Sequence, residues 1–391
     1  MTKLLGVIAT MDPRNGGPPS AGRNIWVAAA RAGLSVSAAF GHENPVSAGE
    51  TVRIDDLIAQ GIEVHAFPLS GSGAGLAGRW GISLALALWL CRRAGDYDVI
   101  QVHGSWAFST CAAVLAGRLH RRPVVLFPDE SLTRFDRAKT GFPLKRTLKK
   151  WIRRLLLGSL AEIVFSSPLE QSDSIDPGEA SRGAVLFHPV LDEHMALFRE
   201  RPTPEEEGLR IGYLGRLHVK KNVEILLDCL MLDPSLRLIV AGDGDADYRD
   251  TLKARAESAG IAARVTWLGF IAAAERPGFF AGIDLLAMPS AYECFGMSAA
   301  EAMSSGVPVI VSSRTGVAGL VERHSAGRVI DPDPAELLAV LRELRQNPDL
   351  LRDYAAGARR LAEDELSLGR YGDRLAALYR GLLREPVANH V

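Results

Sequence analysis

The sequence contains few cysteines, and none of them is spaced for a known cysteine motif. There is no CxxC pair and no accompanying histidine pattern around its four cysteines, Cys91, Cys111, Cys229 and Cys294. This excludes a zinc ribbon and argues against a disulfide-stabilised scaffold. We therefore expect a protein of the reducing cytoplasm, with no metal site and no bound cofactor.

Long hydrophobic runs are also missing. The most apolar stretch, residues 82–91, is too short to span a bilayer and is followed at once by two arginines, so it predicts a buried helix. At the N-terminus, a brief apolar run at residues 4–9 precedes Asp12 and Pro13, which is typical of a strand and not of a signal peptide.

There is no excess of charge of either sign, because 45 basic and 46 acidic residues leave a net charge of −1. A general nucleic-acid-binding role is therefore disfavoured. Residues 137–154 nevertheless hold eight basic residues and no acidic one, and residues 144–157 alternate them with apolar residues at helical spacing. Two interpretations stand side by side: the solvated face of a packed helix, or peripheral contact with the cytoplasmic face of a membrane or a lipid-diphosphate acceptor.

Several familiar catalytic motifs are absent as well. The sequence has no Walker A motif, no HExxH and no nucleophile-elbow serine. The acidic run that begins at Asp243 starts like a calcium loop, but Tyr248 and Ala254 occupy positions that the calcium ligand pattern reserves for glycine and glutamate.

The sequence does show a regular alternation of short apolar runs with helical patterns, which predicts parallel sheets covered by helices on both faces. The predicted strands cover residues 4–10, 36–40, 62–68, 99–103, 124–127 and 163–166, and then residues 210–214, 236–241, 265–268, 285–288, 307–312 and 328–330.

A polar segment divides this α/β chain into two predicted Rossmann-like domains. Residues 199–208 contain two prolines, three consecutive glutamates and no apolar residue, a composition typical of a linker. We predict an N-terminal domain over residues 1–190, a linker over 191–208 and a C-terminal domain over 209–365. Residues 366–391 are expected to form a helix that returns to the N-terminal domain. Ligands of open parallel sheets bind outside the carboxyl ends of the strands, which predicts a cleft between the domains.

Two clusters in the second half carry chemistry. Glu293 follows a predicted strand, Gly296 marks the turn into a helix, and Glu301 lies one turn inside that helix. The free amides of such a helix end suit an anion, and the two carboxylates can accept hydrogen bonds from sugar or ribose hydroxyls. Arg216 and Lys221 likewise follow a strand and are suited to a diphosphate. Capping and solvated residues would explain each cluster alone, but they are the less favoured explanation when both clusters occur in one domain.

A weaker signal lies near the N-terminus. Gly16 and Gly17 follow the first predicted strand and precede a helix for which Ser20 is the predicted N-cap. Glycines permit close approach of a phosphate, although a pair of glycines alone is more often a turn.

In combination, these motifs resemble the GT-B glycosyltransferases of family 4, over essentially the whole chain. The resemblance implies that the domain at residues 1–190 is the acceptor side and that the domain at residues 209–365 binds the nucleotide sugar. The resemblance assigns Glu293 to hydroxyls of the donor sugar, Glu301 to the nucleotide ribose, and Arg216, Lys221 and Gly17 to the diphosphate. It also implies backbone contacts from Phe295, Gly296 and Met297 to the sugar and phosphate, and loops around Gly242 and Phe270 that flank the base.

One position departs from the family pattern. Where the family usually has a histidine after the fifth strand, near the reacting sugar, this sequence has Asp129. Asp129 can replace the hydrogen bond to a sugar hydroxyl, but it adds negative charge near a diphosphate. His103, at the end of the preceding strand, is a second candidate for a sugar or acceptor contact, and a purely structural role fits it equally.

The expected function is retaining transfer of a sugar from a UDP- or GDP-linked donor to a saccharide or lipid-linked acceptor, without a metal, in polysaccharide or glycolipid assembly. The retaining stereochemistry follows from the resemblance alone. Two alternatives remain: a nucleotide-sugar epimerase on the same fold, and a catalytically impaired homologue that binds nucleotide sugar, which the aspartate at position 129 motivates.

Overall fold

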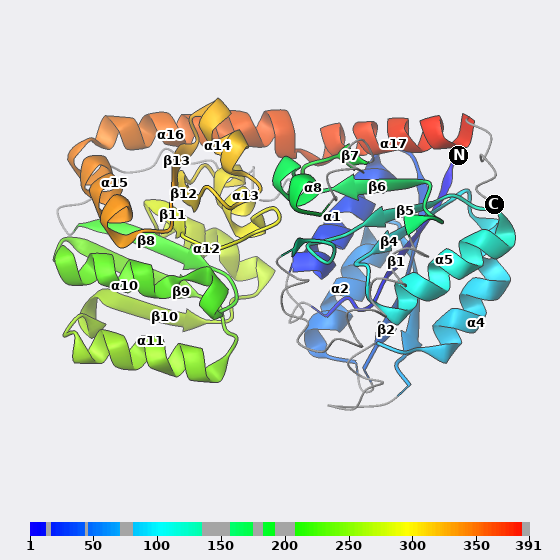
Figure 1. The fold of residues 1–391 in the computed structure, drawn as a ribbon, viewed down its shortest axis with the longest axis horizontal. Helices are drawn as coiled ribbons and strands as arrows, with labels where there is room; N and C mark the ends of the chain where they lie inside the picture. The colour runs from blue at the N-terminus through cyan, green and yellow to red at the C-terminus, as the bar shows by residue number, and fades with distance from the viewer. Residues whose placement is uncertain are drawn as a thin grey trace. The chain divides into compact units, whose positions relative to one another are not determined.

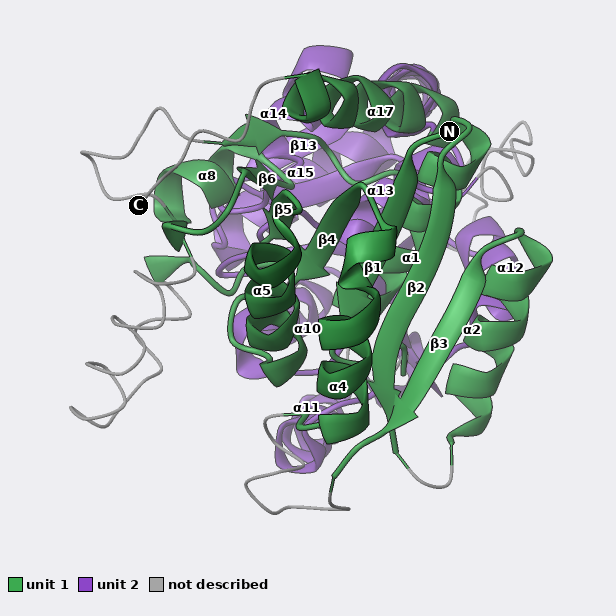
Figure 2. Cartoon of the chain, turned by 90° about the vertical axis from the view of Figure 1, so that its right-hand side faces the viewer, with its two compact units in different colours: residues 1–189, 368–391 green, residues 190–367 purple. Residues whose placement is uncertain are grey.

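The computed structural model describes residues 1–12, 17–43, 46–70, 81–134, 157–174, 183–191 and 208–384. The chain forms two compact units (Figures 1 and 2). Unit 1 contains Met1–Pro189 and Leu368–Val391, and unit 2 contains Val190–Ser367. The prediction of two α/β domains with parallel sheets is confirmed, and each unit is described separately below.

Unit 1 is built on a seven-stranded sheet in the order β3-β2-β1-β4-β5-β6-β7, in which every pair of strands is parallel. The strands are β1 (Lys3–Ile8), β2 (Ser35–His42), β3 (Glu63–Pro68), β4 (Val99–His103), β5 (Val124–Phe127), β6 (Glu162–Phe165) and β7 (Ala184–Val185). The strand order reverses between β1 and β4, which is the place where open parallel sheets bind ligands.

Helices cover this sheet because its central strands are apolar on both faces. They are α1 (Gly17–Arg31), α2 (Ala48–Ala59), α4 (Leu84–Arg93), α5 (Phe108–His120), α8 (Pro168–Ser174) and α17 (Leu368–Arg384). The last of these, α17, belongs to unit 1 although unit 2 precedes it in the sequence (Figure 2). Its Tyr379 is fully buried, and the hydroxyl donates to Gln101 Oε1 of β4 at 2.8 Å.

Unit 2 contains a six-stranded parallel sheet in the order β10-β9-β8-β11-β12-β13. Its strands are β8 (Leu209–Leu214), β9 (Leu236–Ala241), β10 (Val265–Gly269), β11 (Leu285–Met288), β12 (Val309–Ser312) and β13 (Gly327–Ile330). The strand order reverses between β8 and β11, so the loops that follow these two strands are neighbours.

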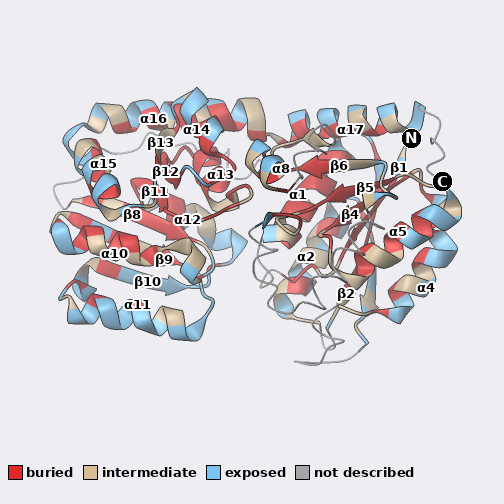
Figure 3. Ribbon diagram, in the orientation of Figure 1, coloured by how far each residue is buried: buried red, intermediate tan, exposed pale blue. Residues whose placement is uncertain are grey.

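Most helices of unit 2 bury an apolar stripe and expose their outer faces, whereas the helix at Met297–Ser304 is buried on nearly every side (Figure 3). The helices of this unit are α10 (Val223–Leu232), α11 (Ala246–Ser258), α12 (Arg276–Ala281), α13 (Met297–Ser304), α14 (Ala318–His324), α15 (Pro334–Gln346) and α16 (Pro348–Leu361).

Two local predictions were wrong. Helix α1 begins at Gly17, so Ser20 lies inside its first turn and is not the N-cap. The apolar stretch 82–91 is not a buried helix, because Leu84 and Leu88 of α4 are 61% and 56% exposed. A helix on the outside of a sheet buries only its inward stripe, here Leu86 and Leu90.

The basic stretch 144–157 lies almost entirely outside the described residues, which resume at Leu157. Among the helices that the structure does describe, none has both the length and the hydropathy that crossing a bilayer requires.

Candidate active site

The first part of the site is the loop that follows β8 in unit 2. Arg216 is exposed there and makes no ion pair with any described residue. Its carbonyl accepts a hydrogen bond of 3.1 Å from the hydroxyl of Tyr213, which is buried in β8. The loop continues into the short turn η3 (Val219–Lys221), which places Lys221 directly before helix α10.

The loop after β11 lies against the loop after β8. Asn222 Nδ2 donates to the carbonyl of Pro289 at 3.0 Å, and the amide of Ala291 donates to the carbonyl of Lys220 at 2.8 Å. Glu293 is held further along this loop, where its amide and carbonyl pair with the backbone of Arg314 and Gly316, both at 3.0 Å. Backbone bonds on both sides therefore fix the position of the glutamate.

Lys221 and Glu293 form an ion pair between Nζ and Oε1, with only 15% and 12% of their side chains exposed. Burial raises the pKa of Glu293, but the positive charges of Lys221 and Lys220 outweigh it, and the net pKa lies below the usual range. The glutamate is therefore an ionised hydrogen-bond acceptor at neutral pH. The pair brings together two residues that the sequence analysis assigned to the sugar and to the diphosphate.

The amino end of helix α13 follows Glu293 directly. Gly296 is its N-cap with φ 105°, and no side chain of the described residues caps this end. A Cβ at Gly296 would lie 2.8 Å from Thr315 Cγ2, so space as well as φ favours glycine. Phe295 is buried before the helix, and Met297 is its first residue. An uncapped helix end of this kind presents amide donors and a partial positive charge to an anion.

Glu301 lies in the second turn of α13 and is buried. Its Oε1 is 2.5 Å from Nη1 of Arg276, the first residue of α12. A cation at a helix amino end opposes the helix dipole, so Arg276 weakens its own helix locally while it neutralises Glu301. The sequence analysis did not identify Arg276; its unfavourable position at the start of a helix is the one signal that could have pointed to it.

Backbone hydrogen bonds join the ends of β8, β9 and β10 at the same edge of the sheet of unit 2. The amide of Gly242 donates to the carbonyl of Gly269 at 2.6 Å, and the amide of Gly215 donates to that of Ala241 at 3.0 Å. A Cβ at Gly242 would lie 1.9 Å from the Gly215 oxygen, so only glycine permits this approach. Phe270 follows Gly269 and is 56% exposed.

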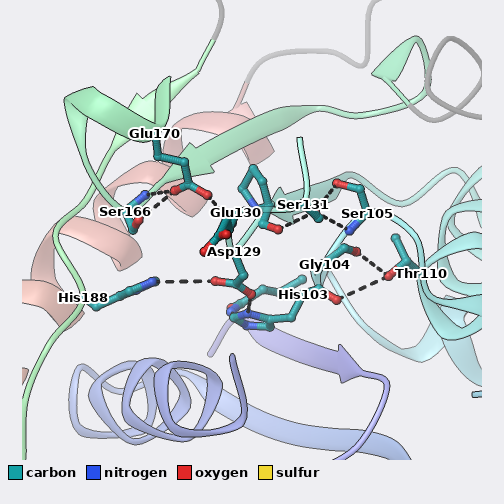
Figure 4. A network of polar contacts seen from close by, with 12 residues as sticks. His103, Gly104, Ser105, Thr110, Asp129, Glu130, Ser131, Ser166, Glu170 and His188 are labelled. Carbon is teal, nitrogen blue, oxygen red and sulfur yellow. Dashed lines mark hydrogen bonds and ion pairs between the residues drawn. The ribbon is translucent and has the colours of Figure 1, made fainter. Parts of the chain in front are cut away.

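In unit 1, Asp129 lies after β5 in a strained turn. Asp129 and Glu130 have φ angles of 49° and 75°, which non-glycine residues rarely adopt. Glu170 of α8 holds the turn, because it accepts hydrogen bonds from the amides of Glu130 at 2.7 Å and Ser166 at 2.8 Å (Figure 4). Burial raises the pKa of Glu170 to about 7 despite these hydrogen bonds.

Two histidines flank the Asp129 carboxylate, whose side chain is 5% exposed (Figure 4). His103 Nδ1 is 2.9 Å from Oδ2, and His188 Nε2 is 3.6 Å from Oδ1. Burial lowers the pKa of His188 to about 4, so this ring is neutral at pH 7. The His103 side chain is fully buried, which favours a role through Asp129 over a direct contact with sugar or acceptor. His188 and Glu170 were not singled out from the sequence.

The N-terminal glycines are only partly described. Gly16 lies outside the described residues. Gly17 is the exposed first residue of α1, a position at which its amide has no partner within the helix.

Comparison with known proteins shows which family the chain belongs to. Residues 16–189 match the family model described as glycosyl transferase 4-like domain, and residues 195–361 match that of glycosyl transferases group 1. Alpha-D-kanosaminyltransferase of Streptomyces kanamyceticus is 30% identical over 353 residues, which cover 83% of this chain and 91% of that protein. The chain belongs to the family 4-type glycosyltransferases of the GT-B fold.

One further relative matches a smaller part of the chain, and one solved structure shows similarity of the fold alone. Mannosylfructose-phosphate synthase of Agrobacterium fabrum is 32% identical over 164 residues, and the match covers 39% of this chain but only 36% of that protein. The crystal structure of Anabaena Alr3699/HepE in complex with UDP and glucose shares the fold, with a TM-score of 0.76 at 21% identity and coverage of 97% of this chain and 100% of that one.

The ion pair between Lys221 and Glu293 gives a first testable prediction. In Lys221→Ala the burial of Glu293 remains while its nearest positive charge is lost, so its pKa should rise. We expect the free energy of unfolding at pH 7 to fall by about 3 kcal/mol, as when a buried pair loses one partner. A lowered pKa stabilises the fold above the unfolded value of the carboxyl, and this contribution is lost as pH falls through the folded value. The difference from wild type should therefore shrink toward about pH 4.

Urea unfolding at pH 7 and pH 4 measures this difference. The double variant Lys221→Ala/Glu293→Gln is the matched control, because it removes both charges and should regain part of the stability at pH 7. An equal loss for the single variant at both pH values would contradict the assigned charge pair.

Proposed function

We propose that this glycosyltransferase is a retaining, metal-independent enzyme of family 4, which transfers a sugar from a UDP- or GDP-linked donor to a saccharide or lipid-linked acceptor. The observation that carries the proposal is the juxtaposition of Lys221, Glu293 and the uncapped end of α13 at one sheet edge. A cation, a hydroxyl acceptor and an anion-binding helix end are what a sugar diphosphate requires.

In the proposed reaction, the bond between the anomeric carbon and the diphosphate oxygen breaks, and negative charge grows on the leaving diphosphate. Arg216, Lys221 and the amides from Phe295 to Met297 stabilise that charge. A donor phosphate oxygen accepts the proton of the acceptor hydroxyl, which attacks from the face that the diphosphate leaves.

Binding of the donor would exchange the partners of the ion pair. Lys221 leaves Glu293 for the diphosphate, and Glu293 then accepts hydrogen bonds from hydroxyls of the donor sugar. Glu301 binds the ribose, with Arg276 holding its carboxylate. Gly17 contacts the diphosphate, Gly242 and Phe270 flank the base, and Asp129 accepts a hydrogen bond from a sugar hydroxyl.

Removal of the exposed Arg216 side chain tests whether its charge stabilises the departing diphosphate. We expect Arg216→Ala to lower turnover by about 10²–10³, the cost of removing one donor that stabilises developing negative charge. Steady-state rates with the identified donor measure the effect. Arg352→Ala is the control, because among the described residues Arg352 pairs only with Asp349 of its own helix, and this pair is exposed. Unchanged turnover in Arg216→Ala would remove Arg216 from the mechanism.

A thermal-shift panel of UDP-, GDP- and ADP-sugars tests donor binding. The true donor at 100 times its Kd should stabilise the protein by about 2.7 kcal/mol. EDTA should change neither this shift nor the rate of transfer. If none of these nucleotide sugars raises the unfolding temperature, the proposal is contradicted. Conversion of the donor without an acceptor would favour the epimerase, and binding without transfer or hydrolysis would favour the impaired homologue.

Membrane contact through residues 144–157 is a further part of the proposal, supported by their basic and apolar alternation. Sedimentation with vesicles rich in phosphatidylglycerol should be strong at low salt and weak at high salt. Charge reversal at Lys149, Lys150, Arg153 and Arg154 should abolish it, and vesicles of phosphatidylcholine are the control. Sedimentation that survives the charge reversal would refute the contact.

A further inference from the structure

A chain of buried polar groups connects the last described helix to Asp129. The Tyr379 hydroxyl of α17 donates to Gln101 Oε1 at 2.8 Å, and Gln101 Nε2 is 2.7 Å from His103 Nε2. The other ring nitrogen of His103, Nδ1, is 2.9 Å from Asp129 Oδ2. The side chains of Tyr379, Gln101 and His103 are fully buried, so solvent does not compete for these bonds.

The direction of donation along this chain determines where the His103 ring carries its proton. Because Gln101 Oε1 accepts from Tyr379, its amide nitrogen faces His103 and donates to Nε2. Nε2 is then an acceptor, and the ring proton lies on Nδ1, from which it is donated to Asp129. The reverse orientation of the amide would place an oxygen opposite Nε2 and would require protons on both ring nitrogens.

Aromatic packing holds the ring in this orientation. His103 stacks on Phe127 with ring centroids 5.1 Å apart, and the edge of Trp26 meets it at 5.8 Å. The hydrogen bond to Asp129 therefore depends on the tautomer, because the ring itself has little freedom to turn.

Asp129 retains one oxygen for a ligand. Oδ2 accepts from His103, whereas Oδ1 is 3.6 Å from His188 Nε2, beyond ordinary hydrogen-bond length. Figure 4 shows the carboxylate between the two histidines.

We propose that Tyr379 and Gln101 are positioning residues, which fix the Nδ1–H tautomer of His103 and thereby orient Asp129 so that Oδ1 receives a hydroxyl of the donor sugar. This inference rests on the proposed contact between Asp129 and the donor sugar. It assigns a functional part to a helix that follows the nucleotide-binding unit in the sequence and packs in the other unit.

The tautomer itself can be measured without an activity assay. In the full chain labelled with ¹⁵N-histidine at pH 7.5, the His103 ring, assigned by its loss in His103→Asn, should show a protonated Nδ1 and an unprotonated Nε2. Gln101→Glu places a carboxylate opposite Nε2, so both nitrogens should then be protonated. A wild-type ring protonated at Nε2 would overturn the inference, whether or not the protein transfers sugar.

Turnover tests the consequence for the reaction. Tyr379→Phe frees the Gln101 amide to rotate, and we expect turnover to fall about five-fold, the factor that corresponds to a hydrogen bond of about 1 kcal/mol. The Kd of the free nucleoside diphosphate should not change, because Asp129 faces the sugar in this scheme.

Tyr371→Phe is the matched control, since Tyr371 is equally buried in the same helix but its hydroxyl has no hydrogen-bond partner among the described residues. It should retain wild-type turnover and tautomer. Wild-type turnover in Tyr379→Phe would overturn the positioning role. Equal losses of turnover in Tyr379→Phe and Tyr371→Phe would also overturn it, because the effect would then come from the packing of α17. Absence of transfer in the wild type, with the expected tautomer present, would instead overturn the proposed function.

Discussion

The site of unit 2 depends on the pairing of one lysine with one glutamate. Burying either charge alone would cost several kcal/mol, so Lys221 and Glu293 are tolerated at low exposure only because they neutralise each other. The pair also joins the loop after β8 to the loop after β11, together with the backbone bond between Ala291 and Lys220. A ligand that separates this pair has to offer a negative group to the lysine and hydrogen-bond donors to the glutamate, and a sugar phosphate is one class of molecule that offers both.

Much of the fold of both units could be predicted from the sequence. Apolar runs at parallel strands are strong signals, and β4, β5, β9 and β11 have the predicted bounds. Glu293 and Lys221 were also identifiable, because each follows a strand at the edge where ligands bind. Their ion pair could not be predicted, because the two residues are 72 positions apart in the sequence. The strand order brings them together, and hydrophobic periodicity does not reveal the strand order.

The site in unit 1 was less predictable for a related reason. Asp129 was noticed because it replaces an expected histidine, but its surroundings come from four separate segments of the chain. Glu170 and His188 carry no motif, and each acquires its role through burial and through one contact with the turn at positions 129 and 130. The left-handed backbone of that turn has no sequence signature either, because neither residue is a glycine.

The polar chain from Tyr379 to Asp129 is difficult to explain as a source of stability. A buried hydrogen bond contributes only about 1 kcal/mol net, and apolar residues of similar shape would pack in the same space without the cost of desolvation. What a polar chain provides and an apolar core does not is a defined direction for each proton. The chain ends on the carboxylate that we propose binds a hydroxyl of the donor sugar, and in that proposal orientation of the carboxylate accounts for the polar chain better than packing does.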